Sequence, residues 1–169
     1  MTGPSGGGED VTGPLAEVVV ASNRAAAGIY ADETGPVIVD FLRRLGFAVG
    51  DPVVVPDGDP VGQAITSAAV AGARLVLTTG GTGLTPTDRT PEVTRALLDF
   101  EVPGIAEAMR AAGVAKGVAG AVLSRGVAGV VGSCLVVNLP GSRGGVKDGL
   151  AVLEPVLVHA VEQVVGSDH

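Results

Sequence analysis

A glycine-rich loop is the part of this sequence with the clearest chemical potential. In the segment LTTGGTGLTPTD, an apolar run is followed by three closely spaced glycines: Gly80, Gly81 and Gly83. Glycines permit positive φ angles, so several backbone N–H groups can converge on a bound anion such as phosphate. The standard nucleotide-binding motifs do not match, because Leu84 stands where a P-loop needs lysine and Pro86 where a dinucleotide fingerprint needs glycine. The loop therefore predicts a phosphate cradle of another kind.

The competing interpretation of this loop is a turn that only reverses the direction of the chain. A plain turn does not account for the hydroxyl groups that the segment carries on Thr78, Thr79 and Thr82. We therefore favour an anion-binding loop over a plain turn.

Two aspartates lie in segments that follow predicted strands. Asp57 lies in VVVPDGDP, and Asp88 ends the glycine-rich segment. A carboxylate beside a phosphate is repelled unless Mg²⁺ bridges the two or the acid takes up a proton. Each aspartate alone also fits a turn position. As a pair at one sheet edge, Asp57 and Asp88 favour a metal-assisted phosphoryl- or nucleotidyl-transfer site, with both side chains as Mg²⁺ ligands.

Two further segments follow predicted strands. NLPGSRGG contains Asn138, Gly141 and Ser142, whose amides and hydroxyl could receive a second anion or the edge of a ring. An ordinary strand-to-helix turn with Ser142 as the helix N-cap explains this segment equally well. Ser124 and Arg125 follow another apolar run, and Arg125 could pair with phosphate or be a surface arginine.

The elements that must position these residues follow from the apolar patterns. We expect strands at 15–22, within 51–56, and at 73–79, 120–124, 126–131 and 133–140. After the first strand we expect a loop over 23–35. We expect helices that end near 45, begin near 60, 90 and 104, and run from 144 with a break at Pro155. This alternation predicts an α/β fold, a three-layer, doubly wound, mostly parallel sheet with helices on both faces. Ligands bind at the carboxyl ends of such strands, where Asp57 and Asp88 would meet.

Capping residues and apolar spacing predict the helix boundaries and faces. Asp59 and Thr90 are expected N-caps, each followed by a proline, and Gly46 suits the position just after a helix. Val37 and Phe100 are expected on the buried faces of their helices.

The composition is typical of one α/β domain with an aliphatic core. Hydrophobic residues make up 46% of the 169 residues and aromatic residues 2%, and we assign a flexible tail to 1–14 and the domain to 15–169. A net charge of −7 without a basic, aromatic-rich stripe argues against nucleic acid as a partner. The single Cys134 excludes an internal disulfide and a cysteine metal cluster. We find no apolar run of roughly 20 residues and no signal peptide, so we expect a cytoplasmic protein without membrane contact.

Three motifs in this order resemble those of the MogA/MoaB family of molybdenum-cofactor biosynthesis, which shares its domain with gephyrin: VVPDGDP, TTGGTGLTPTDRTPEVT and NLPGSRGGVKDGL. The resemblance implies a molybdopterin-binding α/β domain that is usually a homotrimer. It implies Mg²⁺-dependent transfer of AMP from ATP to the phosphate of molybdopterin, which gives adenylyl-molybdopterin and pyrophosphate. It also implies that the product is handed over to the molybdate-inserting enzyme.

The resemblance also implies roles for individual residues. Asp57 and Asp88 take the places of the family's two functional aspartates. Substrate binding is assigned to residues of three segments that follow predicted strands and to the serine before Arg125: Ser22, Gly80, Gly81, Thr82, Gly83, Ser124, Asn138, Pro140, Gly141 and Ser142.

Asn23 departs from the pattern of many catalytic members of the family, which carry an aspartate after the serine that follows the first strand. The same departure occurs in the MoaB branch, some members of which do not catalyse adenylylation. The alternative function is therefore a non-catalytic, MoaB-like molybdopterin-binding or carrier protein. A nucleotide-binding regulator from outside the family is a third interpretation.

Overall fold

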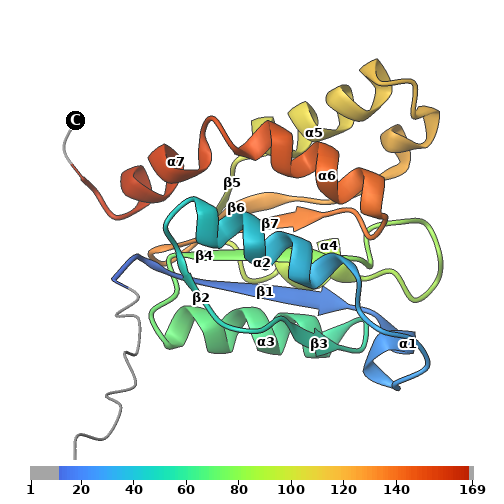
Figure 1. The fold of residues 1–169 in the computed structure, drawn as a ribbon, viewed down its shortest axis with the longest axis horizontal. Coiled ribbons are helices and arrows are strands. Elements are labelled where there is room, and N and C mark those ends of the chain that lie inside the picture. The colour runs from blue at the N-terminus through green and yellow to red at the C-terminus, as the bar shows by residue number, and fades with distance from the viewer. Residues whose placement is uncertain (1–11, 168–169) are drawn as a thin grey trace, which may run out of the picture.

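Seven strands form one mixed sheet in the computed structural model, which describes residues 12–167 (Figure 1). The strands are β1 (Leu15–Ala21), β2 (Ala48–Val49), β3 (Val53–Val55), β4 (Leu75–Thr79), β5 (Phe100–Glu101), β6 (Ala128–Val131) and β7 (Cys134–Leu139). Their order is β2-β1-β4-β7-β6-β5, and β3 pairs with the second half of β1. The pairings among β1, β2, β3, β4 and β7 are parallel, whereas β6 is antiparallel to both β5 and β7. The predicted mostly parallel sheet is confirmed.

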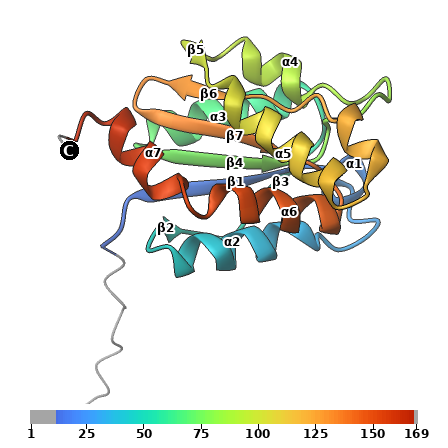
Figure 2. The same cartoon turned by 90° about the horizontal axis from the view of Figure 1, so that it is seen from above.

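Helices cover both faces of the sheet and give the fold its three layers (Figure 2). One face is covered by α2 (Thr34–Arg44), α5 (Pro103–Ala115), α6 (Arg143–Leu153) and α7 (Leu157–Val164). The other face is covered by α3 (Asp59–Val70) and α4 (Thr90–Arg95). Within residues 12–167, two short helices remain, α1 (Asn23–Ala26) after β1 and the 3-10 helix η1 (Ala119–Leu123) after α5.

Two aliphatic core layers hold the helices against the sheet. Alternation along β1 turns Val18 and Val20 toward the α2 layer, and Val19 and Ala21 toward the α3 layer. β4 and β7 are buried along their whole length, as their continuous apolar runs predict for strands covered on both faces. The predicted ligand loops therefore follow directly from the fully buried central strands of the sheet.

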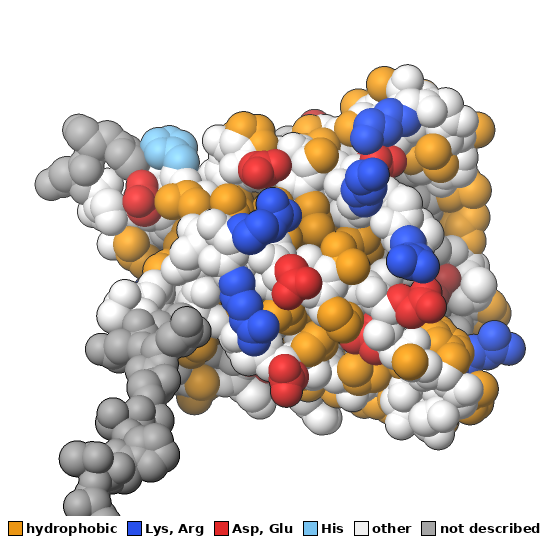
Figure 3. All heavy atoms as spheres, in the orientation of Figure 1, with side chains coloured by type: hydrophobic (Ala, Val, Ile, Leu, Met, Phe, Trp, Pro, Cys, Tyr) orange, Lys and Arg blue, Asp and Glu red, His pale blue; other side chains and the backbone are white. Residues whose placement is uncertain are grey.

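The outer surface of the α2–α6 layer carries charges of both signs. Basic and acidic side chains are interspersed there, with apolar side chains between them (Figure 3). In the part of the chain that the structure describes, no helix is long and apolar enough to cross a membrane.

The chain enters the sheet at the end of the predicted tail. The carbonyl of Pro14 accepts a hydrogen bond of 2.9 Å from the backbone N–H of Ala48, which extends the pairing of β1 with β2 by one residue. Residues 1–11 of the predicted tail 1–14 lie outside the described residues.

Two segments are helical where the prediction had a strand or a loop. Residues 119–123, most of an expected strand, form η1, which packs on α5. A Cβ added to Gly113 of α5 would lie only 2.5 Å from the Cβ of Ala121, so the contact between the two helices is close. A short apolar run lacks the periodicity that separates strand from helix, and packing decides between them. Residues 23–26, expected as loop, form α1, because the Ser22 side chain caps them.

The starts of two helices also differ from the prediction. Gly58 and Arg89 are the N-caps of α3 and α4, and neither Asp59 nor Thr90 caps its helix, because each is already its first helical residue. The side chain of Thr90 is buried against the glycine loop, a tertiary contact that capping rules do not include.

Two residues predicted as buried are exposed instead. α4 ends at Arg95, so Phe100 falls in the edge strand β5 and is 60% exposed. Val37 is 46% exposed, because α2 turns the neighbouring positions toward the sheet. Gly46 has the expected positive φ, 93°, and the helical region breaks around Pro155 as predicted.

Candidate functional site

The parallel strands bring four loops together at the carboxyl edge of the sheet. β3, β1, β4 and β7 are adjacent in that order, so the segments that follow them begin side by side. Asp57 and Asp88 lie close enough for their charges to interact. The pKa of the Asp57 carboxyl is raised, first by burial and second by the charge of Asp88. The structure therefore brings the two predicted aspartates near each other at this edge of the sheet.

Two glycines of the loop have conformations and neighbours that exclude a side chain. Gly80 has a φ of 89° and Gly81 a φ of 68°. A Cβ on Gly80 would lie 2.3 Å from the backbone oxygen of Ala21, and one on Gly81 would lie 2.3 Å from Oδ1 of Asp57. Gly80 therefore permits close packing of the loop on the end of β1, and Gly81 permits the approach of the Asp57 carboxylate.

Asp57 presents a buried, unpaired oxygen to the glycine loop. Its Oδ1 and the Oγ1 of Thr90 are both buried without a hydrogen-bond partner among the described residues. Both atoms would lie 2.3 Å from a Cβ on Gly81, so they face the same point. The backbone N–H of Asp57 donates to Oδ1 of Asn23 at 2.9 Å, which holds the turn in place. Buried polar atoms are rarely left unpaired, so this pair of oxygens indicates a place for a ligand.

Asp88 closes the second half of the glycine loop. Its Oδ2 accepts a hydrogen bond of 3.0 Å from the N–H of Thr85, and its own N–H donates to the Thr85 carbonyl at 3.0 Å. The turn role considered for Asp88 is therefore real. A Cβ on Gly83 would lie 2.8 Å from Oδ2, so the carboxylate also lies against the glycines.

A cation at this site would find two carboxylates. Among the described residues, no group of three or more His, Cys, Asp or Glu side chains is placed to hold a metal ion. Mg²⁺ commonly takes one or two carboxylates and completes its ligands with substrate phosphates and water. Asp57, with its unpaired Oδ1, and the nearby Asp88 fit that requirement.

Asn138 and Thr79 brace the strand ends below the loops. The amide nitrogen of Asn138 donates to Oγ1 of Thr78 at 2.9 Å and to Oγ1 of Thr94 at 3.1 Å. Its Oδ1 accepts from the backbone N–H just before β6 at 3.1 Å. Thr79 donates to the carbonyl of Pro140 at 2.6 Å. These buried bonds tie β4, β7 and α4 together, so the Asn138 side chain is a structural part of the site.

Two serines cap the helices that open at this edge. Ser142 accepts a hydrogen bond from the third residue of α6 at 3.0 Å, the N-cap role considered from the sequence. Ser22 accepts from the third residue of α1 and shares a hydrogen bond of 3.1 Å with the hydroxyl of Tyr30. Gly141 lies against the glycine loop, since a Cβ there would be 3.2 Å from Cα of Gly80.

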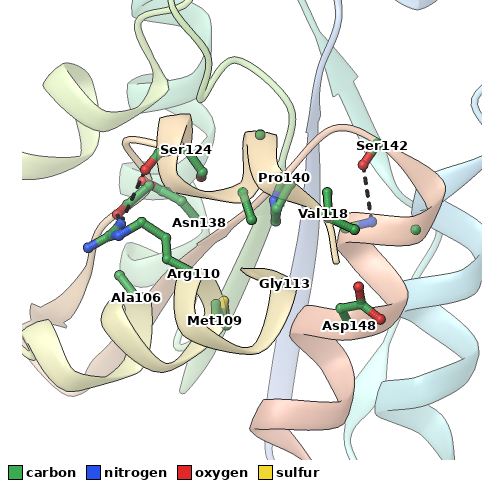
Figure 4. A pocket seen from close by; sticks show the side chains of 15 residues that line it. Ala106, Met109, Arg110, Gly113, Val118, Ser124, Asn138, Pro140, Ser142 and Asp148 are labelled. Carbon is green, nitrogen blue, oxygen red and sulfur yellow. Dashed lines mark hydrogen bonds between the residues drawn. The ribbon is translucent and has the colours of Figure 1, made fainter. Parts of the chain in front are cut away.

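Two cavities open at this edge and meet at Ser142. The first, of about 370 Å³, lies beside the glycine loop, and its lining includes Ser22, Tyr30, Thr79, Gly80, Gly141 and Ser142. The second, of about 330 Å³, lies between α5, η1 and α6 (Figure 4). Its lining includes Met109, Arg110, Ser124, Pro140, Ser142 and Asp148.

Several polar residues at these cavities were missed by sequence reasoning, among them Tyr30, Arg110 and Asp148. Tyr30 is the single tyrosine of the chain, a signal that could have marked it, but it stands in a segment expected as plain loop. Arg110 and Asp148 lie on α5 and α6 and carry no such signal, because charges are common on any helix. The packing of the two helices brings them to one cavity.

Cys134 is excluded as a nucleophile by its burial. The thiol is buried in β7, and burial raises its pKa to about 11. Because the thiolate is the reactive form, a thiol with this pKa is inert near neutral pH.

Comparison with known proteins shows the same domain. A family model described as "Probable molybdopterin binding domain" matches residues 17–159. The solved structure of the molybdopterin biosynthesis Mog protein from Mycobacterium ulcerans is 53% identical in sequence. The match has a TM-score of 0.85 and covers 89% of this chain and 99% of that chain.

Curated relatives carry related names. The molybdenum cofactor biosynthesis bifunctional protein of Synechococcus elongatus is 40% identical over 94% of this chain, which spans 50% of that relative's length. The molybdopterin adenylyltransferase of Haemophilus influenzae is 38% identical over 79% of this chain and 69% of its own length. The match across 17–159, together with the shared fold, shows that this chain belongs to the MogA/MoaB family of molybdenum-cofactor biosynthesis proteins.

Proposed function

We propose that this protein is a molybdopterin adenylyltransferase, which transfers AMP from ATP to the phosphate of molybdopterin and releases pyrophosphate. The observation that carries the proposal is the buried, unpaired Oδ1 of Asp57, which faces a glycine loop beside Asp88. The name of the Haemophilus influenzae relative supports the same reaction.

The site would act through positioning and electrostatics. Two polyanionic substrates must approach each other, and the N–H groups of Gly81, Thr82 and Gly83 would bind phosphate oxygens, whereas that of Gly80 donates to the carbonyl of Leu139. Asp57 and Asp88 would hold Mg²⁺ together with phosphate oxygens of ATP. When bound, Mg²⁺ supplies positive charge that offsets the repulsion between the phosphates and stabilises the departing pyrophosphate.

The two cavities support a site for two substrates. Both border Ser142, so groups bound in each would come together near the loops from β4 and β7. We assign the substrate contacts to residues of these loops and cavities, namely Ser22, Gly80, Gly81, Thr82, Gly83, Ser124, Pro140, Gly141 and Ser142. Asn138 would contribute indirectly, because its side chain is fully engaged in holding the strand ends.

A homotrimer and a hand-over of the product to the molybdate-inserting enzyme complete the proposal. The region of α5 and η1 exposes several large apolar side chains, namely Val114, Val118, Val122 and Leu123. Burial of such a surface in a closed assembly would be favourable. Sedimentation equilibrium measures the assembly directly.

The decisive experiment is a turnover assay with ATP, Mg²⁺ and molybdopterin. The wild-type protein should form adenylyl-molybdopterin and pyrophosphate. An Asp57→Ala, Asp88→Ala double variant should lose about 100-fold or more of this rate, since groups that stabilise transition-state charge carry such factors. Asp51→Ala, at an exposed aspartate just before β3, is the matched control and should retain activity. Undiminished product formation by the double variant would refute the mechanism.

The alternative function, a MoaB-like carrier of molybdopterin, is favoured by Asn23. Oδ1 of Asn23 accepts the hydrogen bond from the backbone N–H of Asp57, so a neutral amide is sufficient for this contact. The aspartate that many catalytic members of the family carry here would add a negative charge that the contact does not need. A carrier would bind molybdopterin without consuming ATP. If the wild-type protein behaves in this way, and Asn23→Asp gains turnover, the carrier function holds.

A further inference from the structure

Arg125 lies in the link between η1 and β6 and contacts the glycine loop at three points. Its backbone N–H donates to the carbonyl of Thr82 at 2.9 Å. In the guanidinium group, Nε donates to the carbonyl of Gly83 at 2.9 Å and Nη2 to the carbonyl of Asp88 at 2.8 Å. The two carbonyls stand on opposite sides of the Asp88 turn, so one planar group spans it.

The arginine is itself held from two sides. Its Nη1 pairs with the carboxylate of Glu92 in α4, and this hydrogen bond lowers the pKa of the Glu92 carboxyl. Nη1 of Arg110 in α5 donates to the carbonyls of Ser124 and Gly126 at 3.3 and 3.1 Å (Figure 4). The backbone on either side of Arg125 is therefore anchored to α5.

We propose that Arg125 is a positioning residue for the adenylyl transfer, and this inference rests on the proposed function. Its guanidinium fixes the loop that presents the glycine N–H groups and Asp88, while its nitrogens point to the protein instead of to a phosphate. A rigid fork of N–H donors can serve two carbonyls and a carboxylate at once. Lysine, a compact ammonium on a flexible stem, cannot reproduce this arrangement.

The first test is hydrogen–deuterium exchange of the ligand-free protein. In Arg125→Ala, the hydrogen-bonded amides of Thr85 and Asp88 should exchange about tenfold faster or more, since losing a charged hydrogen bond costs at least that factor. Amides of β1 should keep their rate. Arg95→Ala is the matched control. Arg95 is an exposed arginine in α4, the helix that also carries Glu92, and its Nε pairs with Oε1 of Glu101 at 3.5 Å. This variant should leave the exchange rates of the loop unchanged. Unchanged exchange in Arg125→Ala would overturn the inference.

The second test separates positioning from a loss of folded protein. Per folded molecule, kcat for adenylyl transfer should fall about tenfold or more in Arg125→Ala and Arg125→Lys, with a smaller change in KM for ATP. Added guanidinium ion at a non-denaturing concentration should restore part of the rate to Arg125→Ala, and ammonium ion should not. Full activity of Arg125→Lys, or equal losses in Arg95→Ala, would refute the positioning role. If the wild-type protein shows no turnover, the proposed function fails, and the exchange experiment alone decides whether Arg125 fixes the loop.

Discussion

Replacement of Gly81 by alanine should damage both the stability and the ligand site. The residue has a φ of 68°, and a left-handed conformation costs an alanine about 1–2 kcal/mol. The new Cβ would lie 2.3 Å from Oδ1 of Asp57 and from Oγ1 of Thr90. Such overpacking costs a further 1–3 kcal/mol, approximately. We therefore expect the free energy of unfolding to fall by about 2–5 kcal/mol.

The burial of the neighbours predicts which of them moves. The side chain of Thr90 is fully buried and cannot retreat, whereas Asp57 is half-buried and can rotate toward solvent. Gly81→Ala should therefore displace the Asp57 carboxylate from the glycine loop. Binding of Mg²⁺ with ATP should weaken even in the molecules that remain folded.

Gly117 provides a matched control for the backbone contribution. Its φ is 87°, and no heavy atom of the described residues lies within 4 Å of an added Cβ. Gly117→Ala should therefore cost only the conformational part, about 1–2 kcal/mol. Urea unfolding of the wild type and both variants gives the free energies, and calorimetric titration of the folded proteins with Mg²⁺ and ATP gives the affinities. Equal destabilisation by the two variants would show that the contacts of the new Cβ with Asp57 and Thr90 cost no stability. Full affinity in Gly81→Ala would show that the Asp57 carboxylate is not displaced.

Two further predictions concern the buried polar groups. The pKa of Asp57 is higher in the folded protein than its ordinary value of 3.8, so ionisation of this carboxyl opposes folding. The stability that the protonated carboxyl contributes is fully present below pH 3.8 and is lost as the pH rises through the folded-state pKa. Asp57→Asn should therefore raise the Tm of the ligand-free protein at pH 7, and the gain should vanish in acid; a Tm gain that is the same at both pH values would contradict this account. Asn138→Ala would leave the buried hydroxyls of Thr78 and Thr94 without their shared donor, and should lower the free energy of unfolding by about 2–4 kcal/mol in urea titrations. A loss below about 1 kcal/mol would mean that the strand ends find other partners.

The placement of the aspartates could be predicted because it depends on a general property of parallel sheets. Asp57 and Asp88 each follow a strand, and parallel neighbours end at the same edge. The apolar runs of the central strands were also clear, since strands covered on both faces show continuous rather than alternating hydrophobicity. The sheet edge and the central strands can therefore be predicted without knowing which side chains are in contact.

Errors occurred where packing competes with local preference. η1 was expected as a strand, but its contact with α5 at Gly113 holds it in a helical turn. Thr90 was expected as an N-cap, yet its hydroxyl is buried beside Asp57 at the glycine loop. In both segments, the deciding neighbour lies on another element, so the local residues did not carry the information.

The sequence by itself determined the layered α/β architecture, the family and the loops that carry the candidate chemistry, because strand periodicity, turn residues and motif order are local properties of the chain. The tertiary structure decided which polar groups face a ligand and which support the loops. Arg125 and Gly83 are 42 positions apart and Asn138 and Thr78 are 60 apart, yet both pairs are hydrogen-bonded. Folding pairs the side chains of Arg125 and Asn138 within the protein while leaving Oδ1 of Asp57 unpaired at the glycine loop. Such pairing depends on distances between segments far apart in the chain, which residue type and spacing do not contain.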